Sequence, residues 1–365
     1  MIDRAGPPAG DIAADGPDEM GRELASGPEA VAATLSALRP RIGTLREHLS
    51  AADSVHVIGT GASLAVARCA EPLLRAADRK AGRRRDLLVR EAAALIMALP
   101  GEESCRCGDL VVAVSRSGKS PEVLAACRYA RAAGARVLAV TSGEASPLAE
   151  LADDTLHVPI GEEHGAATKS ALGGLAALLA MWGLVGADPT ASRALVRLLR
   201  SAANDWPEAW AIGRELASAR RTWFAGFGSG LGVAEAAGLL WHEKVHRLAV
   251  ATTPSGFRHG LIEAASDEDA IVLVEVDPPL PVRAAYMRLL SDDCRALGLL
   301  QVTLTHDRPP AGRWLALRAA EPPGRALESL VRVQQLARAT ALAGGSYSDG
   351  FVVLNAHVWT SAGFE

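Results

Sequence analysis

The chain has 365 residues, of which 49% are hydrophobic, and it carries a formal net charge of −4. At roughly 150 residues per domain, this length predicts two domains, each able to bury a core of its own. The mildly acidic balance argues against a nucleic-acid partner, because such a partner requires a basic face. The longest apolar run, residues 171–187, is shorter than the ~20 residues that span a bilayer, and predicts a buried helix instead of a membrane anchor.

The five cysteines predict reduced thiols in a cytoplasmic protein. Only Cys105 and Cys107 lie close together, and no second pair completes a zinc quartet. No apolar stretch near Met1 resembles a signal peptide. We therefore expect no metal, no cofactor and no membrane association.

The predicted elements begin after a leader, residues 1–19, whose Pro, Gly, Ala and Asp content predicts disorder. A helical pattern then runs from Val31 to Leu45, with a kink at Pro40. From Val55 onward, short apolar runs alternate with Ala-, Leu- and Arg-rich helical stretches, and the predicted strands are Val55–Ile58, Leu87–Arg90, Leu110–Ser115, Val137–Val140 and Leu156–Val158. Fully apolar strands that alternate with helices predict a parallel sheet covered on both faces.

A repeat divides the chain into two similar halves. The pattern Gly59-x-Gly61-x-x-Leu64-x-Val66-Ala67 recurs from Gly226 to Ala234, again directly after a short apolar strand. A repeated strand–turn–helix opening indicates duplication of a whole domain. The later strands of the second half are predicted at Ala270–Glu275, Leu300–Leu304 and Trp314–Leu317. The sequence thus predicts an α/β protein of two tandem domains, residues 20–204 and 205–365.

The first glycine turn resembles a dinucleotide-binding fingerprint only in part. The position of its third glycine is occupied by Leu64, and no acidic residue at the right distance would hold a ribose. The turn still directs backbone N–H groups to the carboxyl ends of parallel strands, where anions bind. We therefore favour an anion site over a nucleotide site.

The loop Ser115-Arg-Ser-Gly-Lys-Ser120 is the most informative segment of the sequence. It joins a predicted strand to a helix that begins near Pro121, so three hydroxyl groups, a glycine and a helix N-terminus converge. Hydroxyl and N–H donors at a helix N-terminus suit a phosphate monoester, and Arg116 and Lys119 can add charge-assisted hydrogen bonds. An ordinary N-cap needs only one hydroxyl, so the loop predicts phosphate binding through Ser115, Arg116, Ser117 and Ser120.

This loop resembles the Ser-x-Ser-Gly-x-Ser/Thr phosphate loop of sugar isomerase (SIS) domains. Gly61-Ala62-Ser63 is similar to their first-strand loop, in which a serine contacts phosphate, and residues 162–170 are similar to the Glu-x-x-x-Ala-(Ser/Ala)-Thr-Lys segment of double-SIS enzymes. The resemblance implies two flavodoxin-like three-layer sandwiches. It also implies phosphate binding by Ser63 and substrate contacts from Gly61, Ala62, Glu162, Thr168 and Lys169.

In the second half, two segments resemble catalytic segments of the same family. By the match of Leu239-Leu-Trp-His-Glu243, Glu243 is the carboxylate that moves a proton between C1 and C2 of the sugar. By the match of Phe257-Arg-His-Gly260, His259 assists ring opening, a role that the family usually fills across a dimer interface. A carboxylate and an imidazole suit these proton transfers near neutral pH.

Four departures from the family pattern surround this pair. Leu240 stands where the family often has a lysine, Gly256 where a glutamate is common, and Leu261 where a proline usually follows His-Gly. The last lysine of the chain is Lys244, so the tail lacks the lysine that enters the sugar site in the related synthase. The phosphate loop therefore matches the family better than the reaction centre does.

Two functions follow from the resemblance. The first is an enzyme that deaminates and isomerises a 6-phosphorylated aminosugar, or deglycates a ketosamine phosphate, through ring opening and an enamine. The second is a non-catalytic sensor of a sugar phosphate. In either case the expected ligand is a phosphorylated sugar, and the expected assembly is a homodimer whose site is shared between subunits.

Overall fold

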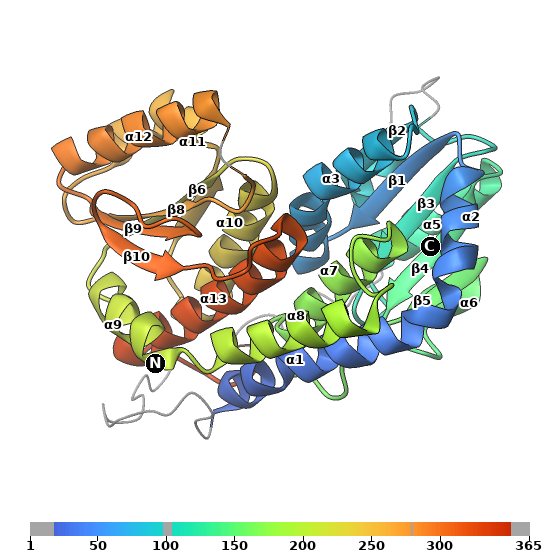
Figure 1. Ribbon diagram of the computed structural model, residues 1–365, viewed down its shortest axis with the longest axis horizontal. Coiled ribbons are helices and arrows are strands. Elements are labelled where there is room, and N and C mark those ends of the chain that lie inside the picture. The colour runs from blue at the N-terminus through green and yellow to red at the C-terminus, as the bar shows by residue number, and fades with distance from the viewer. Residues whose placement is uncertain (1–17, 98–103, 279, 352–365) are drawn as a thin grey trace. The chain divides into compact units, whose positions relative to one another are not determined.

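The computed structural model describes residues 18–97, 104–278 and 280–351 (Figure 1). The first 17 residues of the predicted leader and the tail after Phe351 lie outside this part of the chain. The described residues form two compact units, each built around one sheet. The first sheet unit comprises residues 29–163 and 169–196, and the second comprises residues 18–28, 164–168 and 197–351. A single boundary near Asn204 remains a proposal.

The first sheet is parallel and has the strand order β2-β1-β3-β4-β5. Its strands are β1 (Ser54–Gly59), β2 (Asp86–Glu91), β3 (Leu110–Val114), β4 (Arg136–Thr141) and β5 (Asp154–His157). All five residues of β3 are buried, which explains the unbroken apolar run in the sequence. Five parallel strands with helices between them confirm the predicted fold class.

Helices cover this sheet on both faces, as a parallel sheet requires. On one face α3 (Ala62–Lys80) packs against α7 (Lys169–Met181), and α2 (Ile42–Ser50) also contacts α7. On the other face α5 (Pro121–Ala132) packs against α4 (Ala92–Ile96) and α6 (Pro147–Leu151). The apolar run beginning at Ala171 lies largely in α7, which is buried along nearly its whole length, so it is the predicted core helix.

The second sheet repeats this plan with the order β10-β9-β8-β6-β7. Its strands are β6 (Thr222–Gly226), β7 (Ala249–Thr252), β8 (Ala270–Val274), β9 (Leu300–Thr305) and β10 (Arg313–Ala316). Read from β7, the order matches that of the first sheet strand for strand, which fits the duplication seen in the sequence. The short strand β7 was not predicted.

The helices of the second sheet unit also form two layers. One layer contains α9 (Trp206–Leu216), α10 (Ser229–Leu240), the π-turn η2 (Trp241–Val245) and α13 (Pro322–Ala343); the other contains α11 (Pro254–Arg258), the short η3 (Leu261–Ala264) and α12 (Pro281–Ala296). The remaining helices of the chain are α1 (Glu19–Leu38), η1 (Arg39–Arg41), where Pro40 interrupts the predicted helix, and α8 (Pro189–Ala203). Among the described residues, no helix is both long and apolar enough to cross a membrane.

Candidate functional site

The carboxyl ends of β1 and β3 form the edge where the predicted phosphate residues meet. The strand order reverses between these two neighbouring parallel strands, and ligands of open α/β sheets bind at such a switch point. The β1–α3 turn contributes Gly61 and Ala62, and the β3–α5 loop contributes residues 115–120. Gly61 has φ +56°, which a side chain would disfavour, so the turn needs a glycine there.

The β3–α5 loop gathers its serine hydroxyls at the start of α5. Ser115 is only 3% exposed, and its Oγ lies 3.3 Å from the Oγ of Ser120. Ser120 occupies the N-cap position in extended conformation, yet its hydroxyl makes no capping hydrogen bond. Ser117 Oγ accepts a hydrogen bond from Lys119 N at 3.2 Å. Two hydroxyl groups therefore meet at this helix N-terminus without serving as its cap.

Gly118 lets this loop pass close to the β4–α6 loop. It has φ +64°, and a Cβ atom placed on it would lie 2.1 Å from Ser146 Oγ. Its carbonyl oxygen accepts a hydrogen bond from Leu148 N, which holds the loop against α6. Any side chain at Gly118 would therefore clash with Ser146 and force the two loops apart.

The β1–α3 turn adds a hydroxyl that the sequence reasoning missed. Thr60 Oγ1 is buried and has no hydrogen-bond partner among the described residues, while the Thr60 carbonyl accepts from Ser63 N at 3.2 Å. Ser63, which the sequence predicts to contact phosphate, is half-buried in the first turn of α3. The position of a threonine directly after a predicted strand end was the sequence signal that could have identified Thr60.

Arg116 is tied to a glutamate that the sequence reasoning also missed. Its guanidinium forms an ion pair with Glu163 at 3.2 Å, and the Glu163 side chain is only 1% exposed. Glu163 also accepts hydrogen bonds from Ser170 N at 2.8 Å and Ser170 Oγ at 2.5 Å. It therefore links the serine loop to the first turn of α7, whereas the predicted Glu162 is exposed.

The other residues of the Glu-to-Lys segment take structural positions. Lys169 is buried, and its Nζ donates to the Glu162 carbonyl. Thr168 is buried within the second sheet unit, where its Oγ1 donates to Glu23 at 2.5 Å and its carbonyl accepts from Gln334. These two residues hold the segment in place through contacts with protein groups.

Glu243 lies in the π-turn η2, which directly follows α10. Single π-turns are uncommon and occur mostly at functional sites. The next residue, Lys244, is 1% exposed and donates from Nζ to the carbonyls of Ser348 and Gly350 at 3.0 and 2.9 Å. Burial lowers the pKa of Lys244. The half-buried Glu243 is thus held beside a fixed ammonium group.

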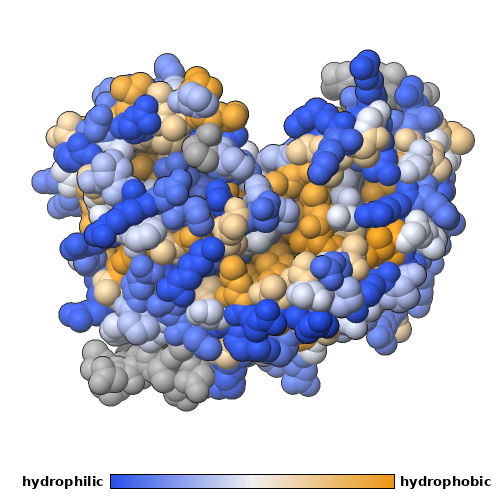
Figure 2. Space-filling view, in the orientation of Figure 1, coloured by the Kyte–Doolittle hydropathy of each residue, from blue (hydrophilic) through white to orange (hydrophobic). Residues whose placement is uncertain are grey.

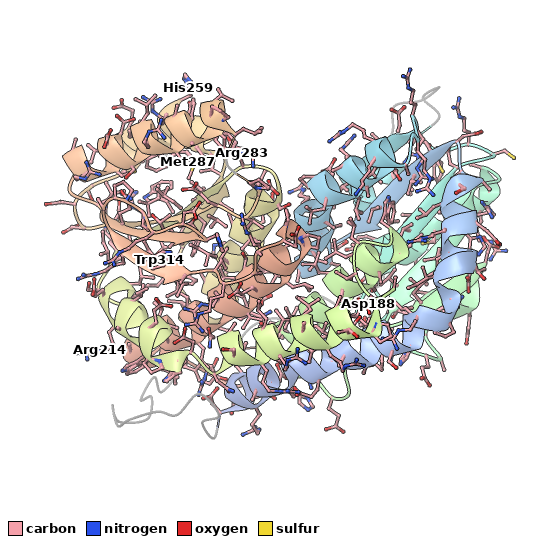
Figure 3. All side chains as sticks on the ribbon, in the orientation of Figure 1. Asp188, Arg214, His259, Arg283, Met287 and Trp314 are labelled. Atoms are coloured by element: carbon pink, nitrogen blue, oxygen red, sulfur yellow. The ribbon has the colours of Figure 1, made fainter. Side chains whose placement is uncertain are left out.

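His259 lies at the opposite end of β7 from Glu243. The π-turn ends just before β7 begins, and His259 follows α11, which comes after β7 ends. Along the chain, the four residues of β7, about 13 Å of extended strand, and the short helix α11 therefore lie between Glu243 and His259. His259 is exposed at the outer surface of the unit (Figure 3).

One buried cluster in the described part of the chain could hold a metal ion. His56, Cys105 and Asp109 offer ligand atoms within 4.8 Å of one another, near the amino ends of β1 and β3. Asp109 already accepts hydrogen bonds from Ser54 Oγ at 2.6 Å and Arg106 N at 2.9 Å. Burial raises the pKa of Cys105 to about 11, which favours the thiol over the metal-binding thiolate. The cluster lies at the sheet edge opposite the serine loop.

Comparison with known proteins agrees with this geometry. The family model described as "SIS domain" matches residues 92–182, a segment that includes the serine loop, Glu163 and Lys169. Residues 92–182 thus match the SIS domain. The resemblance inferred from the sequence is thereby confirmed, and the loop at the β1/β3 switch point belongs to the matched region.

Curated relatives of this chain match over parts of their length. A glutamine–fructose-6-phosphate aminotransferase (isomerizing) from Halobacterium salinarum is 32% identical over 189 residues, which cover 48% of this chain and 31% of that protein. An N-acetylmuramic acid 6-phosphate etherase from Edwardsiella ictaluri is 47% identical over 55 residues, covering 15% of this chain and 18% of that protein. The chain thus aligns with less than a third of either relative.

Solved structures support the fold over nearly the whole chain. The tagatose-6-phosphate ketose/aldose isomerase from Escherichia coli superposes with a TM-score of 0.78 and 22% identity, covering 96% of this chain and 100% of that one. This likeness extends across both sheet units. It confirms the predicted fold of two tandem α/β domains.

Proposed function

We propose that the protein is a phosphosugar enzyme that deaminates and isomerises a 6-phosphorylated aminosugar, or deglycates a related ketosamine phosphate. The observation that carries the proposal is the pair of hydroxyl groups of Ser115 and Ser120, 3.3 Å apart at the N-terminus of α5, in a loop at the β1/β3 switch point that also contains Ser117. Both curated relatives named above have a 6-phosphate sugar in their names, which supports the same ligand class.

The phosphate would bind at the N-terminus of α5, where hydroxyl groups and backbone N–H groups can donate hydrogen bonds to it. The serine hydroxyls, together with Ser63 and the buried Thr60 hydroxyl, offer hydrogen bonds to phosphate oxygens, and the helix N-terminus favours negative charge. Arg116 would add charge from a position that Glu163 fixes. Gly61 and Ala62 would allow the sugar to approach the backbone closely.

The chemistry would fall to Glu243 and His259. The imidazole would move a proton to and from the ring oxygen to open the sugar, and the carboxylate would carry the proton between C2 and C1 through an enamine. Addition of water to the resulting imine would release ammonia and leave the keto-sugar phosphate. For a sugar without an amine, the same proton transfers interconvert aldose and ketose.

A homodimer in which one subunit supplies Glu243 and its partner supplies His259 would complete this pair, as the resemblance to double-SIS enzymes implies; along one chain, η2 precedes β7 and His259 follows it. The surfaces next to both groups support such an interface. Leu248, just after the π-turn, is 65% exposed, and Val282, on the α12 helix that packs against α11, is 75% exposed. Figure 2 shows hydrophobic residues among hydrophilic ones on this outer part of the second sheet unit. A second copy would cover such residues.

The proposal is tested by incubating the protein with glucosamine 6-phosphate and following the release of ammonia and of a ketose phosphate. Turnover that disappears in Glu243→Gln supports the enzyme. Tight binding of the ester with no turnover would instead favour the sensor, which the departures at Leu240, Gly256 and Leu261 also fit. If no sugar phosphate binds at all, both functions fail.

A further inference from the structure

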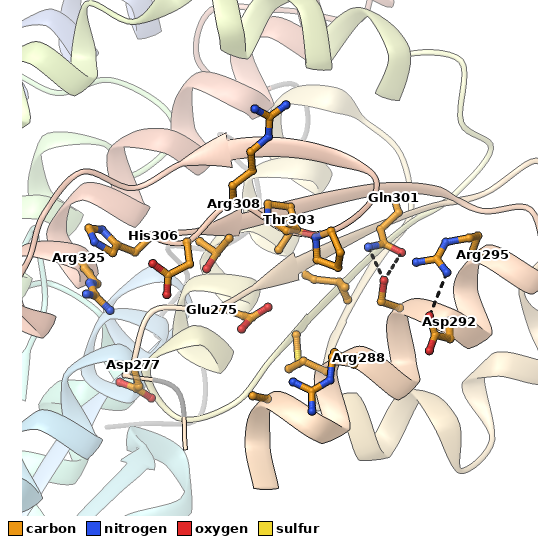
Figure 4. Close-up of a pocket in the computed structure, with 18 residues that line it drawn as sticks. Glu275, Asp277, Arg288, Asp292, Arg295, Gln301, Thr303, His306, Arg308 and Arg325 are labelled. Atoms are coloured by element: carbon orange, nitrogen blue, oxygen red, sulfur yellow. Dashed lines mark hydrogen bonds and ion pairs between the residues drawn. The ribbon is translucent and has the colours of Figure 1, made fainter. Parts of the chain in front are cut away.

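A cavity of about 300 Å³ lies in the second sheet unit, between α12 and the carboxyl ends of β8 and β9 (Figure 4). Its walls come from the loop after β8, one face of α12 and the loop after β9. Its volume falls at the lower end of the range for small-molecule sites. No residue that was predicted for phosphate binding or catalysis lines it.

The β9 wall of this cavity is polar, which is unusual for the covered face of a parallel sheet. Gln301, Thr303 and Thr305 alternate along the strand, so their side chains share one face, and all three line the cavity. Gln301 is held by hydrogen bonds of 2.8 and 3.0 Å with Ser291 of α12. Thr303 is 2% exposed, and its hydroxyl has no hydrogen-bond partner among the described residues. A buried hydroxyl in this state costs free energy unless a ligand meets it.

Glu275 contributes a carboxylate to the same space. It is the first residue after β8, its backbone N–H donates to Leu304 O at 2.9 Å, and no described residue donates a hydrogen bond to its carboxylate. Burial raises the pKa of Glu275; the nearby Arg283 opposes this shift and Asp307 adds to it. In Figure 4 the carboxylate lies in the interior of the group of lining residues, among Thr303, Asp277 and Arg288.

The charges around the cavity balance, which bears on the kind of ligand. Four carboxylates and four guanidinium groups line it: Glu275, Asp277, Asp292, Asp307, Arg288, Arg295, Arg308 and Arg325. Several are already engaged, since Arg295 donates to Asp292 at 3.0 Å and Arg325 donates to the Ala319 carbonyl at 3.0 Å. A lining without net charge gives an anion no preference over a neutral polar molecule.

We propose that this cavity binds a neutral, polyhydroxylated small molecule of monosaccharide size, with Glu275 and Thr303 as its main hydrogen-bonding groups. The carboxylate accepts from ligand hydroxyls, and the Thr303 hydroxyl donates to or accepts from another. No residue of the serine loop, which belongs to the other sheet unit, lines this cavity. The proposal gives the cavity a ligand of its own, distinct from the sugar-phosphate substrate.

The test uses the full chain with D-glucose and sorbitol as neutral probes and glucose 6-phosphate as the charged one. Binding is measured by calorimetry, and hydrogen exchange locates it. We expect the neutral probes to protect amides of α12 and β9. Glu275→Gln should weaken their binding about tenfold and Thr303→Val about fivefold, in line with the loss of single hydrogen bonds.

The controls separate this site from the proposed function. Thr303→Val keeps the shape of the side chain and removes an unpaired hydroxyl, so the variant should fold and still bind glucose 6-phosphate. Ser115→Ala with Ser117→Ala should leave binding of the neutral probes unchanged. The inference is overturned if neither neutral probe protects α12 and β9, or if both Glu275→Gln and Thr303→Val bind them as the wild type does.

Discussion

At the carboxyl edge of the first sheet, the start of α5 is surrounded by hydroxyl groups, whereas in the second sheet an acidic side chain sits at the corresponding edge. Asp277, in the loop after β8, accepts a hydrogen bond from Ser229 N at the start of α10 and pairs with Arg283 at 3.1 Å. A protein carboxylate thus occupies a helix N-terminus that would otherwise attract an anion. We therefore propose that the same strand order supports an open anion site in one unit and a filled one in the other.

The amino edges of the two sheets remain alike. Asp109 precedes β3, and Asp269 precedes the corresponding strand β8. Each accepts a hydrogen bond from the backbone N–H three residues earlier, at 2.9 Å from Arg106 and 3.0 Å from Ser266. The comparison teaches that the duplicated units share the contacts that build the sheet and differ at the edge where ligands bind.

The helix after the first strand differs between the units as well. In the first unit α3 runs unbroken from Ala62 to Lys80, while in the second α10 ends at Leu240 and the chain continues into the π-turn with Glu243. If this turn marks the reaction centre, Glu243→Gln should lower kcat by about 10²–10⁴-fold, the usual contribution of a general acid–base group, with little change in substrate affinity. Glu235, on α10 itself, offers Glu235→Gln as a matched control.

An active site shared between two subunits predicts that mixing two inactive variants restores activity. Equal amounts of Glu243→Gln and His259→Asn protein, refolded together, should regain up to about a quarter of wild-type activity, because half of the dimers are mixed and each mixed dimer has one intact site. Mixtures that stay as inactive as the separate variants would contradict a site built from two subunits.

The serine loop gives the next largest effect. Ser115→Ala with Ser117→Ala removes two hydrogen bonds to a charged group, each worth about 1.5–3 kcal/mol, so sugar-phosphate affinity measured by calorimetry should fall at least about 100-fold. Ser229→Ala removes a buried serine hydroxyl from the second unit and should leave that affinity unchanged. Equal losses of sugar-phosphate affinity in both variants would contradict a phosphate site that belongs to the carboxyl edge of the first sheet alone.

We expect Glu163 to support phosphate binding by holding Arg116 in position. Glu163→Gln weakens the ion pair with Arg116 while keeping the shape of the side chain, and should reduce sugar-phosphate affinity about tenfold. The neighbouring Glu162→Gln, at an exposed position, is the matched control and should bind as the wild type does. A larger loss of affinity in Glu162→Gln would mean that Glu162, and not Glu163, supports phosphate binding.

The shared amino edges predict a matching response to acid. Burial acts to raise the pKa values of Asp109 and Asp269, but hydrogen bonds from Ser54 and Arg221 respectively, together with backbone donors, hold both below the usual value of 3.8. Their stabilisation is present above about pH 4 and is lost as pH falls through the lowered values. Asp109→Asn and Asp269→Asn should each cost about 1–3 kcal/mol at pH 7 in denaturant unfolding and less at pH 3. A cost that stays constant with pH would contradict this account.

The smallest expected effect concerns Asp277, whose carboxylate occupies the carboxyl edge of the second sheet. Asp277→Ser removes the carboxylate from the start of α10 and should create a weak phosphate site there. Hydrogen exchange should then show that millimolar phosphate protects the backbone amides of this turn. The wild type should show no phosphate-dependent protection at this turn. Protection in the wild type would mean that Asp277 does not fill the site.

Much of the fold could be predicted because duplication and apolar strands leave clear local patterns. Gly61 and Gly228, the repeated glycines, have nearly the same backbone angles, φ +56° and +57°. The short strand β7 was missed because its four residues, Ala249–Thr252, are only partly buried and carry no strong apolar pattern. Glu163 was missed in favour of Glu162 because burial, which distinguishes these adjacent residues, depends on tertiary packing.

The central claim is that the serine loop of the first sheet unit holds the phosphate of a sugar ester. A crystal structure with glucosamine 6-phosphate tests it most directly. The account predicts the phosphorus atom at the N-terminus of α5, with Ser115, Ser117 and Ser120 in hydrogen-bond contact with its oxygens. A phosphate bound anywhere else, with this loop turned away from the ligand, would contradict the account.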